Sequence, residues 1–333
     1  MLNLLDALEN FEVNNDYALA IITKTEGSTY RKAGTLMLIE PNGAYWGLLS
    51  GGCLEGDVVE NSKQVFGDKK DLKLSYDMRG DEDLLWGLGL GCEGAIDVLV
   101  KYLPASDNHL GFFSALKELD RGQDHKLTLQ LDANNALHIQ PASRAPENQA
   151  CSPLRDSKWD SDNNELVINL KAPLKLLLCG ASPDVVPVTE IAKSLGWKTW
   201  VIDHRKALAT EKQFPQANQV NHIKRSEWES FSLTEFDAAV VMSHQFERDQ
   251  DYLTRLLASD IRYIGLLGPR KRRDKLLKEC NTDFDHQEGR VFGPVGLDIG
   301  AGTPQTIALA ILAEIQAVLA NKNARFCYQD ITR

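Results

Sequence analysis

The sequence lacks the cysteine patterns of a disulfide framework or a zinc site. Its six cysteines are far apart, with no C-x-x-C pair and no histidine–cysteine cluster at zinc-ligand spacing. In a chain of 333 residues this pattern favours reduced thiols and predicts a cytoplasmic protein. The six are Cys53, Cys92, Cys151, Cys179, Cys280 and Cys327.

Long apolar runs and an excess of positive charge are also missing. No segment approaches the roughly 18 apolar residues that a membrane-spanning helix needs, and the first residues carry acids without the basic region of a secretory signal. The chain has 37 lysines and arginines against 47 aspartates and glutamates, a net charge of −10. Because an acidic surface repels phosphate, we expect neither nucleic acid nor a membrane as its main partner.

Two halves with different patterns follow one another along the chain, as its length predicts. Residues 1–140 alternate strand-like and helical segments with glycine-rich turns, which predicts an α+β domain. Residues 141–172 begin polar and turn-rich and are expected to form a linker with a strand. Residues 173–333 alternate buried-strand runs with helices, which predicts a doubly wound parallel sheet.

Two glycine-rich loops in the first half each contain a cysteine. LLSGGCLEG (48–56) places Gly51, Gly52 and Cys53 before a predicted helix, where the thiolate form that binds metals is favoured. Glu55 either binds a ligand or, as an acid in the first turn, complements the helix dipole. The second loop, GLGLGCEG (87–94), holds Cys92. A lone cysteine is usually a small buried hydrophobe, so each of the two cysteines could be either a ligand or a core residue.

The first strand–turn–helix of the second half, CGASPDVVP, only partly matches a dinucleotide-binding turn. Gly180 is present, but Ser182 and Pro183 stand where a second glycine is expected. Asp203 ends the next strand, where an acid could bind a ribose hydroxyl. NAD(P) binding is therefore a weak alternative, and the same residues could simply shape the turn.

Four further residues are candidates for binding an anion or a metal. His244 ends a strand at the carboxyl edge of the predicted sheet, where open α/β folds bind ligands. Gly300 and Thr303 precede a long helix, whose N-terminus attracts anions. Arg31, in the hairpin GSTYRKAG, could bind a phosphate. Strand capping, helix capping and a basic hairpin tip are the respective structural alternatives.

These motifs together resemble the XdhC/CoxI family, the xanthine dehydrogenase accessory factors. The first half carries GSTYRKAGTLMLI (27–39), LLSGGCLEGDV (48–58) and GLGLGCEG (87–94). The second half carries VIDHR, FPQAN, VMSHQFERDQDYL, RYIGLLGPRKRR and GPVGLDIGAGTPQTIALAILAEI. They run in family order over nearly the whole chain, except residues 141–163. The family turn commonly reads Gly-Ala-Gly-His where this chain has GASPD, which puts dinucleotide binding most in doubt.

The resemblance implies an XdhC/CoxI-type domain followed by a Rossmann-like domain. It also implies a chaperone that binds the molybdenum cofactor (molybdopterin), protects it, supports its sulfuration and inserts it into a xanthine dehydrogenase-type molybdenum hydroxylase. The implied partners are the apo-hydroxylase and a cysteine desulfurase, and a homodimer is left open. The expected metal ligand is Cys53, and the expected cofactor-binding residues are Cys53, Gly51, Gly52, Glu55, Cys92, Arg31, Gly180, Asp203, His244, Gly300 and Thr303.

No catalytic acid, base or nucleophile stands out, so we predict a cofactor chaperone rather than a turnover enzyme. Two other classes of function remain as alternatives. One is an NAD(P)- or nucleotide-dependent enzyme that uses the Rossmann-like half. The other is a structural adaptor whose glycine loops only make turns.

Overall fold

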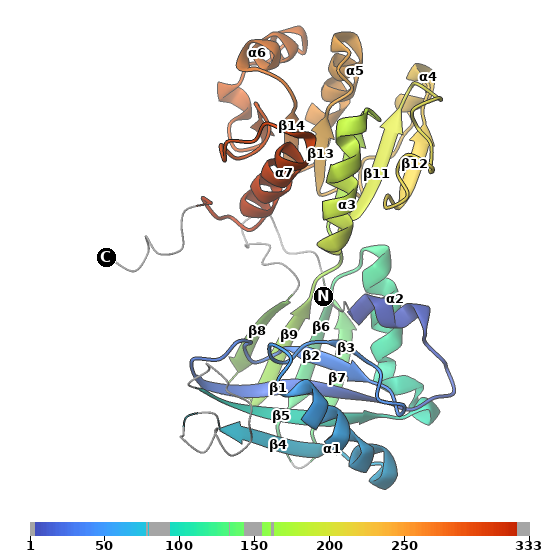
Figure 1. Cartoon of the computed structure of the whole chain (residues 1–333), viewed down its shortest axis with the longest axis vertical. Helices are drawn as coiled ribbons and strands as arrows, with labels where there is room; N and C mark the ends of the chain where they lie inside the picture. The colour runs from blue at the N-terminus through green and yellow to red at the C-terminus, as the bar shows by residue number, and fades with distance from the viewer. Residues whose placement is uncertain are drawn as a thin grey trace. The chain divides into compact units, whose positions relative to one another are not determined.

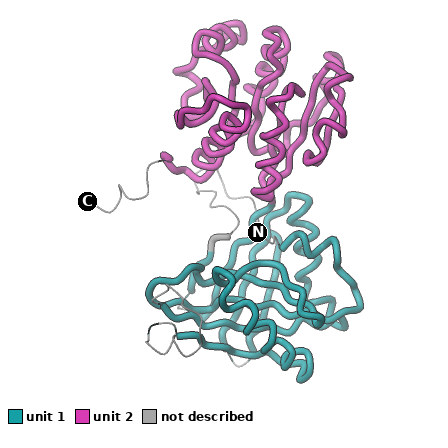
Figure 2. Tube along the Cα trace, viewed as in Figure 1, with its two compact units in different colours: residues 1–147, 154–172 teal, residues 148–153, 173–333 magenta. Residues whose placement is uncertain are grey.

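The boundary between the two halves of the chain falls between Ala172 and Pro173, where the chain divides into two units (Figure 2). The structure, a computed structural model, describes residues 4–77, 79, 94–132, 134–142, 155–160 and 163–324. Each unit has its own hydrophobic core. Within the described residues, no helix is long and apolar enough to cross a membrane.

Unit 1 is built on an antiparallel five-stranded sheet, here called sheet A (Figure 1). Its strands in the order β3-β2-β1-β5-β4 are Tyr45–Gly47, Leu36–Ile39, Tyr17–Gly27, Gly94–Leu103 and Leu72–Asp77. Strand β1 carries apolar residues on both faces, and each face packs in a hydrophobic cluster. Ala20 and Ile22 pack in a cluster with Val58 and Val65 of helix α1 (Glu55–Asp68), whereas Ile21 faces the main core.

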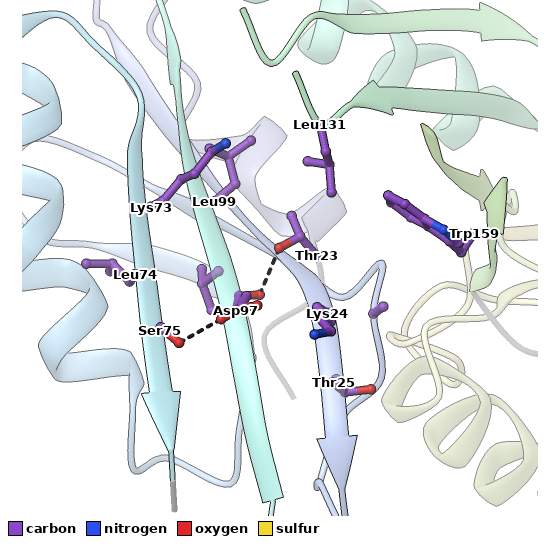
Figure 3. Close-up of a pocket in the computed structure, with 12 residues that line it drawn as sticks. Thr23, Lys24, Thr25, Lys73, Leu74, Ser75, Asp97, Leu99, Leu131 and Trp159 are labelled. Atoms are coloured by element: carbon purple, nitrogen blue, oxygen red, sulfur yellow. Dashed lines mark hydrogen bonds between the residues drawn. The ribbon is translucent and has the colours of Figure 1, made fainter. Parts of the chain in front are cut away.

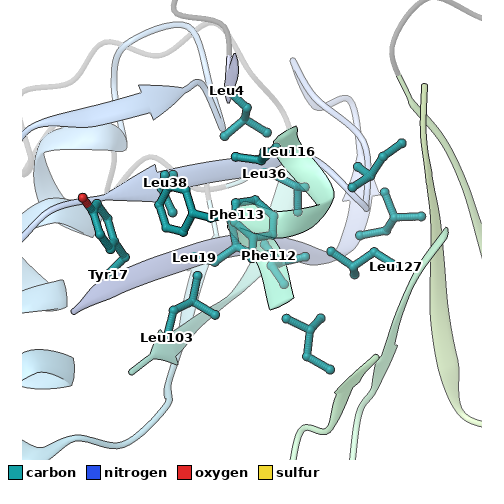
Figure 4. Packing of buried hydrophobic residues seen from close by; sticks show 14 of the residues in the cluster. Leu4, Tyr17, Leu19, Leu36, Leu38, Leu103, Phe112, Phe113, Leu116 and Leu127 are labelled. Atoms are coloured by element: carbon teal, nitrogen blue, oxygen red, sulfur yellow. The ribbon is translucent and has the colours of Figure 1, made fainter. Parts of the chain in front are cut away.

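A second antiparallel sheet, sheet B, and helix α2 (Phe112–Arg121) contribute to the main core of unit 1 (Figure 4). The order of sheet B is β7-β6-β9-β8, with strands Leu137–Pro141, His125–Gln130, Glu165–Leu170 and Arg155–Asp160. The described residues of unit 1 also form two short 3₁₀ helices, η1 (Leu4–Glu9) and η3 (Ala105–Gly111). The core side chains shown in Figure 4 include Leu19, Leu36, Leu38, Phe112, Phe113, Leu116 and Leu127.

The described part of the segment 141–172 forms two strands of sheet B, whereas the sequence predicted a linker with one strand. Strand β8 reads RDSKWD, a polar run whose place in the sheet comes from its pairing with β9. It is also attached to the β1–β2 loop, because the Ser157 hydroxyl donates to the Ala33 carbonyl at 2.5 Å. Gly34 has φ +85°, and a Cβ there would lie 2.5 Å from Ser157 Cβ.

Unit 2 is a parallel six-stranded sheet with helices on both faces. Helices α3 (Val186–Ser194) and α7 (Pro304–Leu319) cover one face. Helices α4 (Arg225–Trp228), α5 (Phe246–Leu257) and α6 (Arg270–Glu279) cover the other. The strands in the order β12-β11-β10-β13-β14-β15 are Gln219–His222, Lys198–Asp203, Lys175–Cys179, Ala238–Val241, Tyr263–Leu266 and Val291–Phe292.

This arrangement confirms the predicted fold class, a Rossmann-like doubly wound sheet after an α+β domain. The strand order corresponds to 3-2-1-4-5-6, the arrangement of dinucleotide-binding folds. The strand order reverses between the parallel neighbours β10 and β13, and open α/β sheets bind ligands beside the carboxyl ends of the strands at such a point. Gly180 and His244 follow these two strands.

Candidate functional site

One buried carboxylate organises the loop that carries Cys53. Glu55 is 1% exposed, and its Oε1 accepts the backbone N–H groups of Leu49 at 2.9 Å and Ser50 at 2.7 Å. Its Oε2 accepts the Ser50 hydroxyl at 2.7 Å. Burial alone raises the pKa of Glu55, but the hydrogen bonds from Ser50 and Leu49 outweigh it, and the net pKa is below its ordinary value. Both oxygens therefore serve the loop itself rather than pointing to a ligand.

Ser50 is the residue that the sequence analysis missed in this loop. Its Oγ accepts three consecutive backbone N–H groups, those of Gly52, Cys53 and Leu54, at 3.3, 3.1 and 3.2 Å. It thus holds the turn that precedes α1 while donating to Glu55, the first residue of the helix. The N-cap residue of α1 is Leu54, whose side chain forms no capping hydrogen bond. Because Ser50 and Glu55 are five residues apart, they do not have the S-x-x-E spacing of a capping box, and that motif could not point to this pair.

Cys53 and the two glycines before it lie at the surface of this loop. A Cβ added to Gly51 or Gly52 would meet no atom within 4 Å, so the backbone there borders open space. Gly52 has φ +110°, a conformation that favours glycine. Cys53 is a free, half-buried thiol that packs against the cluster beneath α1. Cys92 lies outside the described residues.

Arg31 belongs to the β1–β2 loop. Its Nε is buried and has no hydrogen-bond partner within the described part of the chain. Its guanidinium carbon lies 5.2 Å from the centroid of the Tyr30 ring, whose side chain is 63% exposed. A buried guanidinium nitrogen without an acceptor favours the predicted anion contact over a plain hairpin tip.

In unit 2, the acid expected to bind a ribose is instead bound within the protein. Asp203 is fully buried and accepts the Ala181 N–H at 2.8 Å and the Arg205 guanidinium at 2.9 and 2.6 Å. Burial alone raises the pKa of Asp203, but the bonds from Arg205 and Ala181 outweigh it and lower the net pKa. The carboxylate and the Ala181 N–H of the turn are therefore paired with each other, and the structure gives no support to the NAD(P) alternative.

A second buried acid–arginine pair lies along the same edge of the sheet. Asp249 accepts the Ser243 hydroxyl at 2.5 Å and Arg272 Nη2 at 2.7 Å. Burial, and then the charges of Asp249 and Asp203, hold the pKa of the Cys179 thiol well above its ordinary value. Cys179 is thus an inert core residue, as predicted for an isolated cysteine.

Glycine at position 180 is explained by the close approach of two backbone segments rather than by phosphate binding. Its φ is +141°, and a Cβ at this position would lie 2.5 Å from the Met242 carbonyl oxygen. Glycine is therefore required here by the close approach of the backbone after β10 to the end of β13.

His244 pairs with an acid that the sequence analysis did not select. It has φ +63°, and its Nε2 lies 2.9 Å from Asp184 Oδ2 in the 3₁₀ turn η4 (Pro183–Val185). Two other acids at this edge of the sheet, Asp203 and Asp249, are instead paired with arginines. Among the described residues, no group of three or more histidine, cysteine, aspartate or glutamate side chains could hold a metal.

Thr303 is the predicted N-cap of α7. Its Oγ1 accepts the Thr306 N–H at 3.3 Å, and the Thr306 hydroxyl oxygen in turn accepts the Gly302 and Thr303 N–H groups. These N–H groups are therefore already paired within the cap. Gly300, with φ +74°, lies in the exposed loop before it.

Comparisons with known proteins agree with both halves of this description. The family model for the XdhC and CoxI family matches residues 12–77, which include the Cys53 loop, and the model for the XdhC Rossmann domain matches residues 176–315. A crystal structure described as a xanthine dehydrogenase from Bacillus halodurans has a TM-score of 0.79 and 26% sequence identity, with 98% of both chains covered.

Two curated proteins match along almost their whole length. A probable xanthine dehydrogenase subunit from Bacillus subtilis (strain 168) is 32% identical over 323 residues, 94% of this chain and 95% of its own. The molybdenum cofactor insertion chaperone PaoD of Escherichia coli (strain K12) is 20% identical over 323 residues, 96% of this chain and 89% of its own. The chain therefore belongs to the XdhC and CoxI family.

Proposed function

We propose that this protein is a chaperone of the molybdenum cofactor. It binds the cofactor, protects it, supports its sulfuration and inserts it into a molybdenum hydroxylase of the xanthine dehydrogenase type. The observation that carries the proposal is similarity over nearly the whole chain to two relatives, one named for xanthine dehydrogenase and the other for molybdenum cofactor insertion.

The Cys53 loop has the properties that a temporary metal site needs. The thiol is free and half-buried, and the glycines before it leave open space for a bulky cargo. A thiolate is a soft ligand that suits a thiophilic metal centre. Because Ser50 and Glu55 fix the backbone on the protein side, the thiol is held in place without another ligand group from the loop.

Arg31 supplies the second feature that such a cargo needs. The cofactor carries a phosphate, and a guanidinium binds phosphate through paired N–H donors. The buried Nε of Arg31, without a partner in the described chain, is available for such an acceptor. Cys53 would therefore hold the metal end of the cargo, and Arg31 is the candidate for its phosphate.

The finer parts of the proposal concern partners. A cysteine desulfurase would supply the sulfur atom for sulfuration, and an apo-hydroxylase would receive the finished cofactor. A homodimer remains a prediction, as does a cytoplasmic location, which rests on the scattered cysteines. Within the proposal no residue is assigned a catalytic role.

Cofactor retention tests the proposal. The protein is purified from cells with active cofactor synthesis, and its molybdenum and pterin contents are measured for the wild type, Cys53→Ala and Cys280→Ala. Cys280 is also a free, partly buried thiol but lies in unit 2, which makes it a matched control. We expect the wild type and Cys280→Ala to retain molybdenum and pterin, and Cys53→Ala to lose most of the molybdenum.

Two results would count against this account. A wild type that never retains pterin while cofactor is abundant contradicts the chaperone proposal. Equal molybdenum in the wild type and Cys53→Ala contradicts the role of Cys53 as the metal ligand.

A further inference from the structure

Unit 1 contains a cavity of about 660 Å³, a size typical of small-molecule sites (Figure 3). Its floor is formed by β1, β4 and β5 of sheet A, and β8 of sheet B contributes Trp159. The lining residues combine hydroxyl, charged, aliphatic and aromatic groups. They include Thr23, Lys73, Ser75, Asp97, Leu99 and Trp159.

A β-bulge shapes the floor of this cavity. The register of β1 against β5 shifts between Ile22 and Lys24, so Thr23 is the extra residue. Its hydroxyl donates to the Asp97 carbonyl at 3.1 Å. On the neighbouring strand, Ser75 is paired with Asp97, and paired residues of antiparallel strands point to the same face of the sheet.

The cavity is separate from the Cys53 loop. Strand β5 alternates, so that Asp97 and Leu99 face one side of sheet A and Val98 faces the other. Leu99 belongs to the core shared with sheet B, whereas Val98 belongs to the cluster beneath α1, against which Cys53 packs. Cys53 and the floor of the cavity are therefore on opposite faces of sheet A.

Three groups in the cavity have unused binding capacity. Asp97 Oδ1 accepts the Ser75 hydroxyl at 2.7 Å, and within the described residues its second oxygen has no hydrogen-bond partner. The Lys73 ammonium forms no ion pair with any described residue. Trp159 is 45% exposed, and no described aromatic ring stacks on it. An acceptor, a cation and an open indole face thus border one space.

We propose that this cavity binds a flat, nitrogen-rich heteroaromatic ring that carries a phosphate. The indole of Trp159 offers a surface on which such a ring stacks. The Asp97 carboxylate accepts ring N–H and amino groups, and the Lys73 ammonium attracts the phosphate. Leu99 supplies apolar contact from the floor.

Two sources share this chemistry, a phosphorylated pterin and a guanine nucleotide. Both rings present an amino group beside a ring N–H, the pair of donors that one carboxylate accepts. The pterin source rests on the proposed function, whereas the guanine source does not. In either case this is a second binding site, not the Cys53 site.

Isothermal titration calorimetry of the full-length protein tests the proposal with four probes. These are guanosine monophosphate, adenosine monophosphate, neopterin and inorganic phosphate. We expect guanosine monophosphate or neopterin to bind at least about tenfold more tightly than adenosine monophosphate, which lacks the paired donors, and than phosphate alone. Tighter binding of neopterin identifies the pterin source, and tighter binding of the nucleotide identifies the guanine source.

Variants connect the binding to the cavity. Asp97→Asn should weaken binding of both rings about tenfold, and Trp159→Leu should weaken both because it removes the stacking surface. Lys73→Gln should weaken the nucleotide but not neopterin, which has no phosphate. Lys63→Gln is the matched control, because Lys63 is an exposed lysine on α1. If Asp97→Asn fails to fold, Trp159→Leu tests the proposal instead, because Trp159 is half-exposed.

Three results overturn the proposal. They are no binding of neopterin or guanosine monophosphate at millimolar concentration, binding of adenosine monophosphate as tight as that of the tighter of these two probes, and unchanged binding in Trp159→Leu. If the wild type retains the molybdenum cofactor but shows one of these results, the cavity proposal fails and the chaperone proposal stands. If guanosine monophosphate binds but no cofactor is ever retained, the cavity stands with the guanine source.

Discussion

At the scale of single residues, the conformation of the Cys53 loop depends mainly on Glu55, whose carboxylate binds the loop itself rather than a ligand. A buried carboxylate that accepts three hydrogen bonds from the loop fixes both the backbone before α1 and the Ser50 side chain. The thiol of Cys53 is placed by this arrangement, because the Cys53 N–H is one of the three donors bound to Ser50.

Replacing Glu55 with glutamine should therefore destabilise the protein. The amide nitrogen cannot accept the hydrogen bonds that the carboxylate accepts, so we expect Glu55→Gln to lower the free energy of unfolding by about 2 kcal/mol at pH 7. Glu60→Gln, at an exposed position on α1 whose carboxylate pairs with the exposed Lys63, should change it by less than about 0.5 kcal/mol. Urea unfolding measures both.

The effect of Glu55 should also depend on pH. Because its pKa in the folded protein is below the ordinary value of 4.5, its ionised form contributes stability that is fully present above pH 4.5. That contribution is lost as the pH falls through the folded-state pKa. The difference between the wild type and Glu55→Gln should therefore narrow in acid. A difference that stays constant down to the acid limit of folding would contradict this role of the carboxylate.

Sequence reasoning located this loop but assigned its residues differently. The glycines and the helix start were visible in the pattern, and so was Cys53. The hydrogen bonds that Glu55 and Ser50 form within the loop were not visible in the pattern, because they depend on a side chain that turns back onto the preceding backbone. Asp203 was placed correctly at the end of β11, but its pairing with Arg205, two residues later, left nothing for a ribose.

At the scale of secondary-structure elements, the backbones that follow β10 and β13 lie so close together that no side chain should be tolerated at Gly180. A Cβ there would be 2.5 Å from the Met242 carbonyl, and φ is +141°. We expect Gly180→Ala to cost at least about 2 kcal/mol of stability. Gly51→Ala should cost far less, because its Cβ would meet no atom within 4 Å. Comparable thermal melting of the two variants would contradict this assignment.

The elements of unit 2 were easier to predict than those of unit 1. Strands such as β10 (KLLLC) are buried on both faces of a parallel sheet, and their apolar runs alternate clearly with helices. Strand β8 has no such pattern. It reads RDSKWD, and its pairing with β9 places it in sheet B, while the hydrogen bond from Ser157 to Ala33 connects it to the β1–β2 loop. Its single large apolar residue, Trp159, lines the cavity of unit 1.

At the scale of the whole molecule, the two units contribute different features to one proposed function. Unit 1 carries the open Cys53 loop, Arg31 and the cavity. Unit 2 has the strand order of a dinucleotide-binding fold, but two buried acids at its carboxyl edge are paired with arginines. The fold alone would have favoured a nucleotide-dependent enzyme, but the pairing of the two acids with arginines argues against that function.

The most direct test of the chaperone account is transfer of the cofactor to an acceptor enzyme. The protein is purified with cofactor bound, mixed with a cofactor-free xanthine dehydrogenase-type hydroxylase, and hydroxylase activity is measured against the amount of protein added. The account predicts activity that rises with loaded wild-type protein and is absent with unloaded protein. Loaded protein that retains its cofactor, or an acceptor that gains equal activity without it, would contradict the central claim.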